Sequence, residues 1–237
     1  MESFWVALKA IFVKDVIVEL RARQVLPTMV VLGMLIVYIL RLVSEPASGA
    51  APLVGAAALW VAFLFCGLLA QERSFAAEQH QGCMDGLLLA PCDPGTIYLA
   101  KLCVNVVVLC VFEVIIVPVV LIVFRLSVGA RWPDLLAVLL LGNIGISSVG
   151  TLFSAAVQLA RTRGSLLSII VLVILMPLMV PATFALLVLF GALPEEVGGS
   201  GSLAFVGSFK AAAGYMLAFD AVFVVACWLL FAVVVEE

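Results

Sequence analysis

Six long apolar runs limit this chain to one kind of fold. A helix that crosses the hydrocarbon layer of a bilayer needs about 20 apolar residues. The sequence predicts such spans at about 25–44, 53–71, 96–124, 135–160, 165–191 and 209–235. Of the 237 residues, 66% are apolar and only 11% are charged, which is extreme for a soluble globule. We therefore expect an all-α polytopic membrane protein, with residues 1–237 forming a single transmembrane domain and no independent catalytic domain.

Residues 1–24 predict a helix that lies along the membrane surface. One side of this helix is an apolar stripe, formed by Val6, Ala10, Val13, Ile17 and Leu20. Charged residues lie off the stripe, namely Lys9, Lys14, Asp15, Glu19, Arg21 and Arg23. Such a two-sided pattern is typical of interfacial helices. The charges also interrupt the apolar run, and no small-residue cleavage site follows, so a cleaved signal peptide is not indicated.

The distribution of basic residues predicts the orientation. With six spans and an inside N-terminus, eight basic residues lie at inner ends: Lys9, Lys14, Arg21, Arg23, Arg73, Lys101, Arg161 and Arg163. Four lie at outer ends: Arg41, Arg125, Arg131 and Lys210. Cytoplasmic ends carry the excess of Lys and Arg, so both termini are expected in the cytoplasm. The net charge of −3 indicates no nucleic-acid partner.

A polar island, Gln71–Lys101, separates the second and third runs. It contains four acids, two bases and the only histidine, His80. The second span can continue as a helix through Glu72 and Arg73 toward Gln81. Gly82 and Gly86 are points where a helix can break, and Asp93-Pro94 predicts the cap and first residue of the next span. We expect one or two short helices at the cytoplasmic surface, with an ordinary solvated loop as the alternative. Because loops of this length are often functional, we interpret about 72–94 as a docking segment for a partner.

Polar residues also occur inside the expected spans. Glu113 falls near the middle of the third span and Asp220 near the middle of the sixth, where an acid is costly. One face of the fourth span carries small and polar residues: Asn143, Ser147, Gly150, Ser154 and Gln158. These groups are packing contacts between helices, the lining of a substrate path or, as a weaker third option, parts of a proton relay. We favour packing, because small and polar residues are the usual contacts between helices in lipid.

The residues needed for cofactor or metal chemistry are sparse. A single histidine cannot supply paired imidazoles, and the six cysteines, Cys66, Cys83, Cys92, Cys103, Cys110 and Cys227, form no CxxC pair. No Walker P-loop, GxSxG or HExxH motif occurs. We expect no catalytic site and no cofactor bound by this chain. Energy for uphill movement would have to come from another subunit or an ion gradient.

Several motifs resemble one family of membrane proteins. Within the island these are Glu72-Arg73-Ser-Phe75, then Gly82, then Asp85-Gly86-Leu87-Leu88-Leu89-Ala90-Pro91, and finally Ala100-Lys101. Further matches run from Arg163 through Pro177 to Thr183, and from Leu217 through Asp220 to the final Glu236-Glu237. As a set they resemble the CcmB family over essentially the whole chain. These proteins are the membrane (permease) subunits of the ABC-type haem export system for cytochrome c maturation.

The resemblance implies a six-span ABC-2 exporter fold in the cytoplasmic (inner) membrane, with ATP bound by a partner and haem as the cargo of the complex. The implied partners are a cytoplasmic ABC ATPase (CcmA-like), a haem-handling membrane protein (CcmC-like), a small membrane subunit (CcmD-like), the haem chaperone (CcmE-like), membrane lipid and a second copy of this chain. The resemblance leaves open whether haem itself is moved or is released from its chaperone.

The same resemblance makes the docking segment a coupling element to the ATPase. The candidate coupling residues are Glu72, Arg73, Phe75, Glu78, Gly82, Met84, Asp85, Gly86, Leu87 and Pro91. We expect the apolar side chains to fill a groove of the ATPase, and Glu78 and Asp85 to pair with basic residues at its rim. Two other functions remain open: an ABC-2 permease for another cargo, such as a lipid-linked glycan or a drug, and a membrane scaffold that transports nothing.

Overall fold

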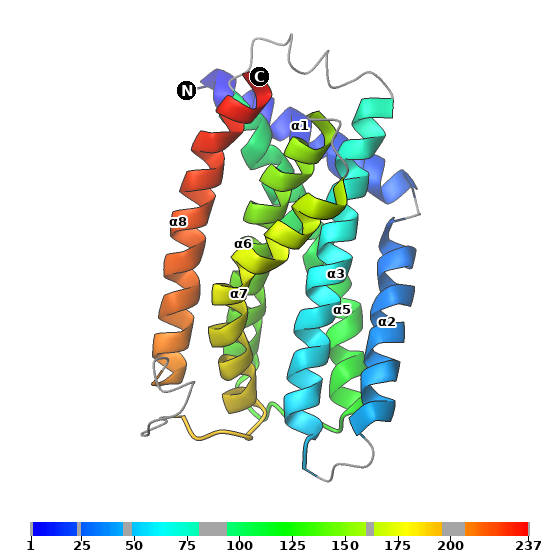
Figure 1. Cartoon of the computed structure of the whole chain (residues 1–237), viewed down its shortest axis with the longest axis vertical. Coiled ribbons are helices and arrows are strands. Elements are labelled where there is room, and N and C mark those ends of the chain that lie inside the picture. The colour runs from blue at the N-terminus through cyan, green and yellow to red at the C-terminus, as the bar shows by residue number, and fades with distance from the viewer. Residues whose placement is uncertain are drawn as a thin grey trace.

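The computed structural model describes residues 2–22, 25–44, 49–80, 94–159, 164–195 and 207–236, and over these ranges it is a bundle of long helices (Figure 1). The helices are α1 (Glu2–Ala22), α2 (Val25–Ser44), α3 (Ala51–His80), α5 (Pro94–Val123), α6 (Trp132–Leu159), α7 (Gly164–Leu189) and α8 (Phe209–Glu236). Within the described ranges, the six helices from α2 to α8 are long and apolar enough to cross a membrane. The expected all-helical, multi-pass membrane fold is confirmed.

Some helix ends differ from the sequence prediction. The fourth span, expected from 135, begins at Trp132, because Pro133 and Asp134 occupy its first turn. Proline suits that position, since its missing N–H would have no partner within the helix. The third span begins at Pro94, as its Asp93-Pro94 sequence predicts. The second spanning helix continues beyond its apolar run near 71 to His80, in agreement with the predicted continuation toward Gln81.

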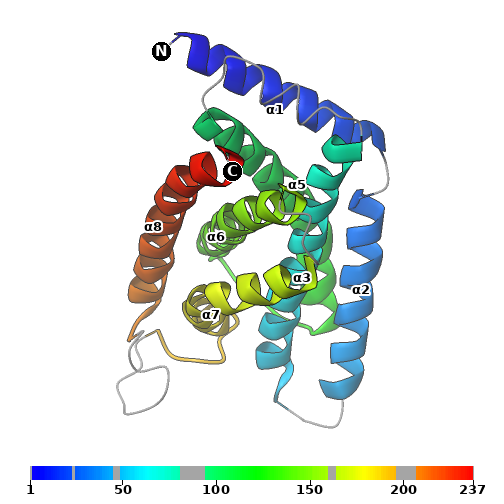
Figure 2. The ribbon, with the colours of Figure 1, turned by 45° about the horizontal axis from the view of Figure 1, so that its top comes forward.

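Helix α6 lies at the centre of the bundle. Figure 2 shows it surrounded by α3, α5, α7 and α8, all of which contact it. It is the most buried of the six spans, whereas α2 and α8 are the least buried. Helix α2 packs against α3 and α5 on the outer side. The exposed side chains of α2 and α8 are apolar, as expected for surfaces that face lipid: examples are Val31, Tyr38, Val222 and Leu229.

Glycines on α6 allow its neighbours to approach closely. A Cβ atom at Gly142 would collide with the indole ring of Trp60 on α3. Toward α7 and α8, a Cβ atom at Gly145 would collide with Leu178 and lie 2.7 Å from Asp220 Oδ1. Small residues at helix contacts are the usual means of close packing in membranes, because lipid itself provides no hydrophobic drive for helices to associate.

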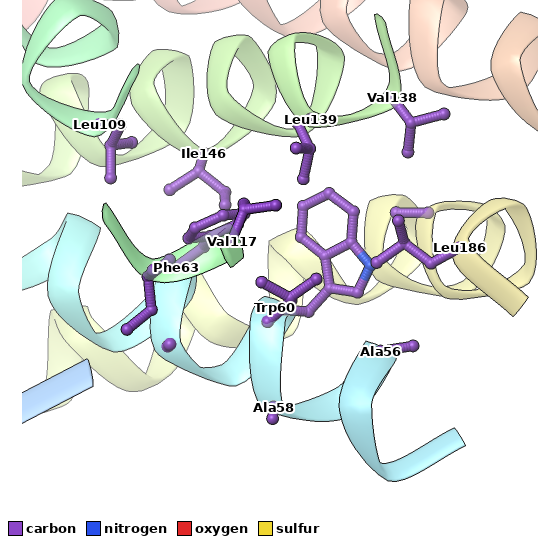
Figure 3. Close-up of a cluster of buried hydrophobic side chains, with 14 of the residues drawn as sticks. Ala56, Ala58, Trp60, Phe63, Leu109, Val117, Val138, Leu139, Ile146 and Leu186 are labelled. Atoms are coloured by element: carbon purple, nitrogen blue, oxygen red, sulfur yellow. The ribbon is translucent and has the colours of Figure 1, made fainter. Parts of the chain in front are cut away.

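An aromatic core fills the space between α3, α5, α6 and α7. Figure 3 shows the Trp60 indole reaching from α3 toward Leu139 of α6 and Leu186 of α7. The ring centroids of Trp60 and Phe63 are 5.7 Å apart, and those of Phe63 and Phe112 are 5.8 Å apart, both in edge-to-face geometry. Aromatic pairs prefer this arrangement. The aromatic chain therefore joins the middle of α3 to α5.

Helix α1 runs across the spanning helices at the end of the bundle where both termini lie, the α1 end (Figures 1 and 2). Its side chains Ile11 and Asp15 are buried against the bundle, while Val6, Val13 and Ile17 of the apolar stripe are exposed. The stripe therefore points away from the protein, where lipid would cover it. The predicted N-terminal helix is confirmed, and its place at the membrane surface stays a prediction.

Helix α7 bends near its middle (Figure 1). It contains Pro177 and Pro181, each of which lacks the N–H that would bond to the preceding turn. Between α7 and α8 an apolar groove of about 440 Å³ opens, lined by these prolines, Val180 and the aromatic side chains of α8. Phe219 and Phe223 stack in it, with ring centroids 4.1 Å apart.

The contact at Gly142 gives a stability prediction. Gly142→Ala should lower the thermal stability of the detergent-purified protein, because overpacking of this kind costs about 1–3 kcal/mol. The matched control is Gly214→Ala on α8, where no atom lies within 4 Å of the added Cβ. That control should keep or raise stability, since alanine favours helix more than glycine does. Equal melting temperatures for the two variants would contradict the packing argument, as would failure of Trp60→Leu to restore stability to Gly142→Ala.

Candidate functional site

The island predicted as a coupling segment is carried by α3 and α5. Helix α3 brings the chain to His80 at the α1 end, and α5 leaves that end at Pro94. Six candidate residues lie outside the described ranges: Gly82, Met84, Asp85, Gly86, Leu87 and Pro91. Arg73, Phe75 and Glu78 belong to α3, but their side chains are also outside the description. Their role as a docking site therefore stays a prediction. The described part of the site is the platform, which we define as α1 together with the ends of α3 and α5 that adjoin the 81–93 segment.

A buried ion pair dominates that platform. Lys101 on α5 places its Nζ 2.8 Å from Oδ2 of Asp15 on α1, and the two side chains are only 2% and 7% exposed. A second lysine, Lys14, reaches Oδ1 of the same carboxylate at 3.1 Å from the exposed side of α1. Both carboxylate oxygens thus face an ammonium group. Removing one partner from such a buried pair leaves an uncompensated charge and typically costs about 3–5 kcal/mol.

Apolar side chains enclose the ion pair in a core of their own. This second core is separate from the main one, and it joins α1 to the near ends of α5, α6 and α8. Its members include Ile11, Ile97, Leu102, Leu152 and Phe231. Tyr98 lies in the same core with its ring 5.6 Å from that of Phe231. Because these neighbours exclude water, the attraction between the two charges is screened less than at a surface.

Hydrogen bonds fix the same half of α5 to α6. The Tyr98 hydroxyl donates to the Ser148 carbonyl oxygen at 3.1 Å. Two turns further along α5, the Asn105 amide donates to the Thr151 hydroxyl at 2.8 Å. Tyr98, Lys101 and Asn105 are spaced by three and four residues, so they lie on one side of the helix. The α1 end of α5 is therefore attached to α1 by charge and to α6 by hydrogen bonds.

The predicted intramembrane polar residues form two groups, which contact different sides of α6. Asn143 is fully buried; its amide lies 3.8 Å from Cys110 Sγ on α5, and the Glu113 carboxyl group, also on α5, is next to it. Ser147 is buried one turn further along α6, and Gln71 of α3 lies against Gly150. These residues join α6 to α5 and α3, as a packing role requires.

Asp220 belongs to α8 and contacts another side of α6. It is buried, and its carboxylate abuts Gly145 from α8. Positions 143 and 145 are two residues apart, so their side chains diverge by about 200° around the helix. The structure therefore brings Glu113 and Asn143 together and places Asp220 apart from them.

At the opposite end of the bundle, Arg131 joins three connecting regions. Its guanidinium lies 2.8 Å from Asp134 on α6 and 3.5 Å from Glu195, which follows α7. It also covers the ring of Phe209, the first residue of α8, at 4.7 Å from the ring centroid. The guanidinium, the carboxylates and the ring hold the far ends of these helices together.

Sequence reasoning did not find the Asp15–Lys101 pair. Both residues were counted only as charges on the cytoplasmic side. A signal was available, since Lys101 lies two turns inside an apolar helix, where a charged side chain needs a partner. Which of the acids nearby would supply that partner depended on how α1 lies. As for metals, the described part of the chain contains no group of three or more potential ligands.

Two comparisons connect this architecture to known proteins. The family model described as "CcmB protein" matches residues 6–227, from α1 into the last third of α8. The protein named "Heme exporter protein B" of Paracoccus denitrificans (strain Pd 1222) is 32% identical over 158 residues, which cover 66% of this chain and 67% of that relative. The residues matched by the family model include both helices that carry the island and both members of the buried ion pair. The chain belongs to the CcmB family, whose members are membrane subunits of a transport system.

Proposed function

We propose that this chain is the membrane subunit of an ABC-type haem exporter that acts in cytochrome c maturation. The family match and the name of the relative support the haem exporter assignment. The observation that carries the mechanism is the platform at the α1 end. The two helices that flank the 81–93 segment both begin or end there, and one of them is locked to α1 by a buried ion pair.

The α1 end faces the cytoplasm of a cell inner membrane in this proposal. The sequence places eight basic residues on the inner side, of which Lys9, Lys14 and Lys101 are described at the α1 end, and only four, Arg41, Arg125, Arg131 and Lys210, toward the opposite end. The excess of basic residues at the α1 end is what the positive-inside rule requires of a cytoplasmic side. Both chain termini lie at the same end (Figure 1).

A cytoplasmic ABC ATPase docks on residues 72–94 and supplies the energy. Apolar side chains of the segment, Phe75, Met84 and Leu87, enter a groove of the ATPase, and Glu78 and Asp85 meet basic residues at its rim. ATP-driven closure then pushes on α3 and α5, because the segment is continuous with both helices. This movement drives either the export of haem or the release of haem from its chaperone.

The remaining partners follow from the same assignment. Two copies of the chain form the permease. The haem-handling membrane protein and the small membrane subunit bind within the bilayer, where the apolar sides of α2 and α8 are the least buried surfaces of the six spans. Haem ligation is left to the partner subunits, and Glu113, Asn143, Ser147 and Asp220 act mainly as packing contacts around α6.

Charge reversal in the coupling segment tests ATPase docking. Glu78→Lys with Asp85→Lys should weaken co-purification of the ATPase about tenfold, since two rim attractions become repulsions. The holocytochrome c yield should fall in parallel. The control is Lys210→Glu, an exposed charge reversal at the opposite end of the bundle, which should change neither measurement.

Other outcomes of that experiment identify other functions. Unchanged ATPase binding and unchanged cytochrome yield would refute the coupling role. Loss of ATPase binding with a normal cytochrome yield would indicate a permease for another cargo. An ATPase rate in reconstituted membranes that is the same with and without this chain would instead indicate a scaffold.

Neutral replacements of the buried acids test the packing role. Asp220→Asn and Glu113→Gln should lower the amount of assembled subunit in the membrane several-fold, since each alters a contact around α6. The yield of holocytochrome c per assembled subunit should stay near that of the wild type. A normal amount of subunit combined with a lost yield would show that the acid acts directly in transport.

A further inference from the structure

The Asp15–Lys101 pair is placed where movement of the coupling segment first reaches the bundle. Lys101 follows Pro94, the first residue of α5, by seven residues, so the pair lies about 10 Å along the helix from the end of the segment. A push on the segment therefore displaces Lys101 before it reaches the centre of the bundle. Asp15 is the group on α1 that receives this displacement.

The surroundings of the pair make it a fixed attachment. Both side chains are buried, and Ile11, Tyr98 and Leu102 around them belong to one apolar core. Apolar contacts alone hold two helices together in many alternative registers. A buried ion pair favours one register, because any other leaves a charge without its partner in a medium of low polarity. The pair thus defines the position of α1 along α5.

The polar contacts of α5 define which helices move together. Tyr98 and Asn105 attach the same half of α5 to Ser148 and Thr151 of α6. The second core adds the C-terminal half of α8, which lies at the α1 end, through Cys227 and Phe231. Among the side chains that the structure describes, helices α2, α3 and α7 contribute none of the buried members of this core. The α1 end therefore contains one packed unit that includes α1 and the near halves of α5 and α6.

We infer that Asp15 and Lys101 are a positioning pair for energy coupling: they fix α1 to α5 so that force on the 81–93 segment moves α1, α5 and α6 as one unit. This inference rests on the proposed function, since it needs an ATPase that acts on that segment. Neither residue touches cargo or nucleotide. The pair acts by keeping an in-plane helix, anchored in the membrane surface by its apolar stripe, in register with a spanning helix.

The test uses the complete complex in its native membrane, with three variants of the pair. Lys101→Met breaks the pair. Asp15→Lys with Lys101→Asp exchanges the charges. Asp15→Leu with Lys101→Met replaces the pair by apolar side chains, a change that buried ion pairs often tolerate without loss of stability. The control is Lys9→Gln, which removes an exposed charge from the same helix.

Three quantities are measured for each variant: the amount of assembled complex, its ATPase turnover, and its holocytochrome c yield. We expect the apolar pair to assemble within about twofold of the wild type and to hydrolyse ATP, with a yield per complex at least tenfold lower. Exchanged charges should restore at least half of the yield lost in Lys101→Met. Lys9→Gln should resemble the wild type in all three quantities.

Three results would overturn the inference. Full yield from the apolar pair would show that the ion pair only holds α1 in place. An assembled charge-exchange variant with no recovery would show that the pairing itself is unimportant. A loss of yield in Lys9→Gln equal to that in Lys101→Met would point to the net charge of α1.

The outcome is separable from that of the proposed function. If Glu78→Lys with Asp85→Lys uncouples the complex while the pair variants remain active, only the positioning role fails. If those segment variants leave ATPase binding and cytochrome yield intact, the coupling function itself fails.

Discussion

Four spanning helices depend on close approach to α6. Glycine at positions 142, 145 and 150 lets Trp60, Asp220 and Gln71 fill spaces that a side chain would occupy. In lipid there is little hydrophobic gain from bringing two apolar helices together, so van der Waals packing and buried hydrogen bonds must hold the bundle. The glycines increase van der Waals packing, and the bond between Asn105 and Thr151 is a buried hydrogen bond of this kind. The outer helices, with larger apolar surfaces toward lipid, take their positions from this centre.

Polar contacts join several helices at each end of the bundle. At the α1 end, an ion pair and two hydrogen bonds join α1, α5 and α6 within a separate apolar core. At the opposite end, Arg131 joins the starts of α6 and α8 to the chain that follows α7. Between the two ends the core is largely aromatic and aliphatic, with buried polar side chains such as Asn143, Ser147 and Asp220 around α6. Directional contacts thus fix how the helices meet at both ends of the bundle.

Much of the fold was predictable because lipid imposes a simple rule on sequence. A stretch that crosses hydrocarbon must be helical and apolar, so the six spans could be placed to within a few residues. Prolines at 94 and 133 refined their starts, since proline suits the first turn of a helix. The continuation of α3 to His80 could also be predicted, because Gly82 is the first residue beyond the apolar run at which a helix is expected to break. Within the candidate site, the polar island was visible as a break in hydropathy, and the burial of Asn143 and Ser147 followed from their spacing on one face.

The sequence by itself determined the number of spans, the N-terminal helix and the place of the polar island, since each follows from local hydropathy and charge. Only the tertiary structure decided which helix is central and which charges meet. Asp15 and Lys101 are 86 residues apart, and nothing local distinguishes Asp15 from the other acids near the α1 end. Its partnership depends on the direction in which α1 crosses the bundle, which packing sets. The separation of Asp220 from Glu113 likewise depends on which side of α6 each neighbouring helix occupies.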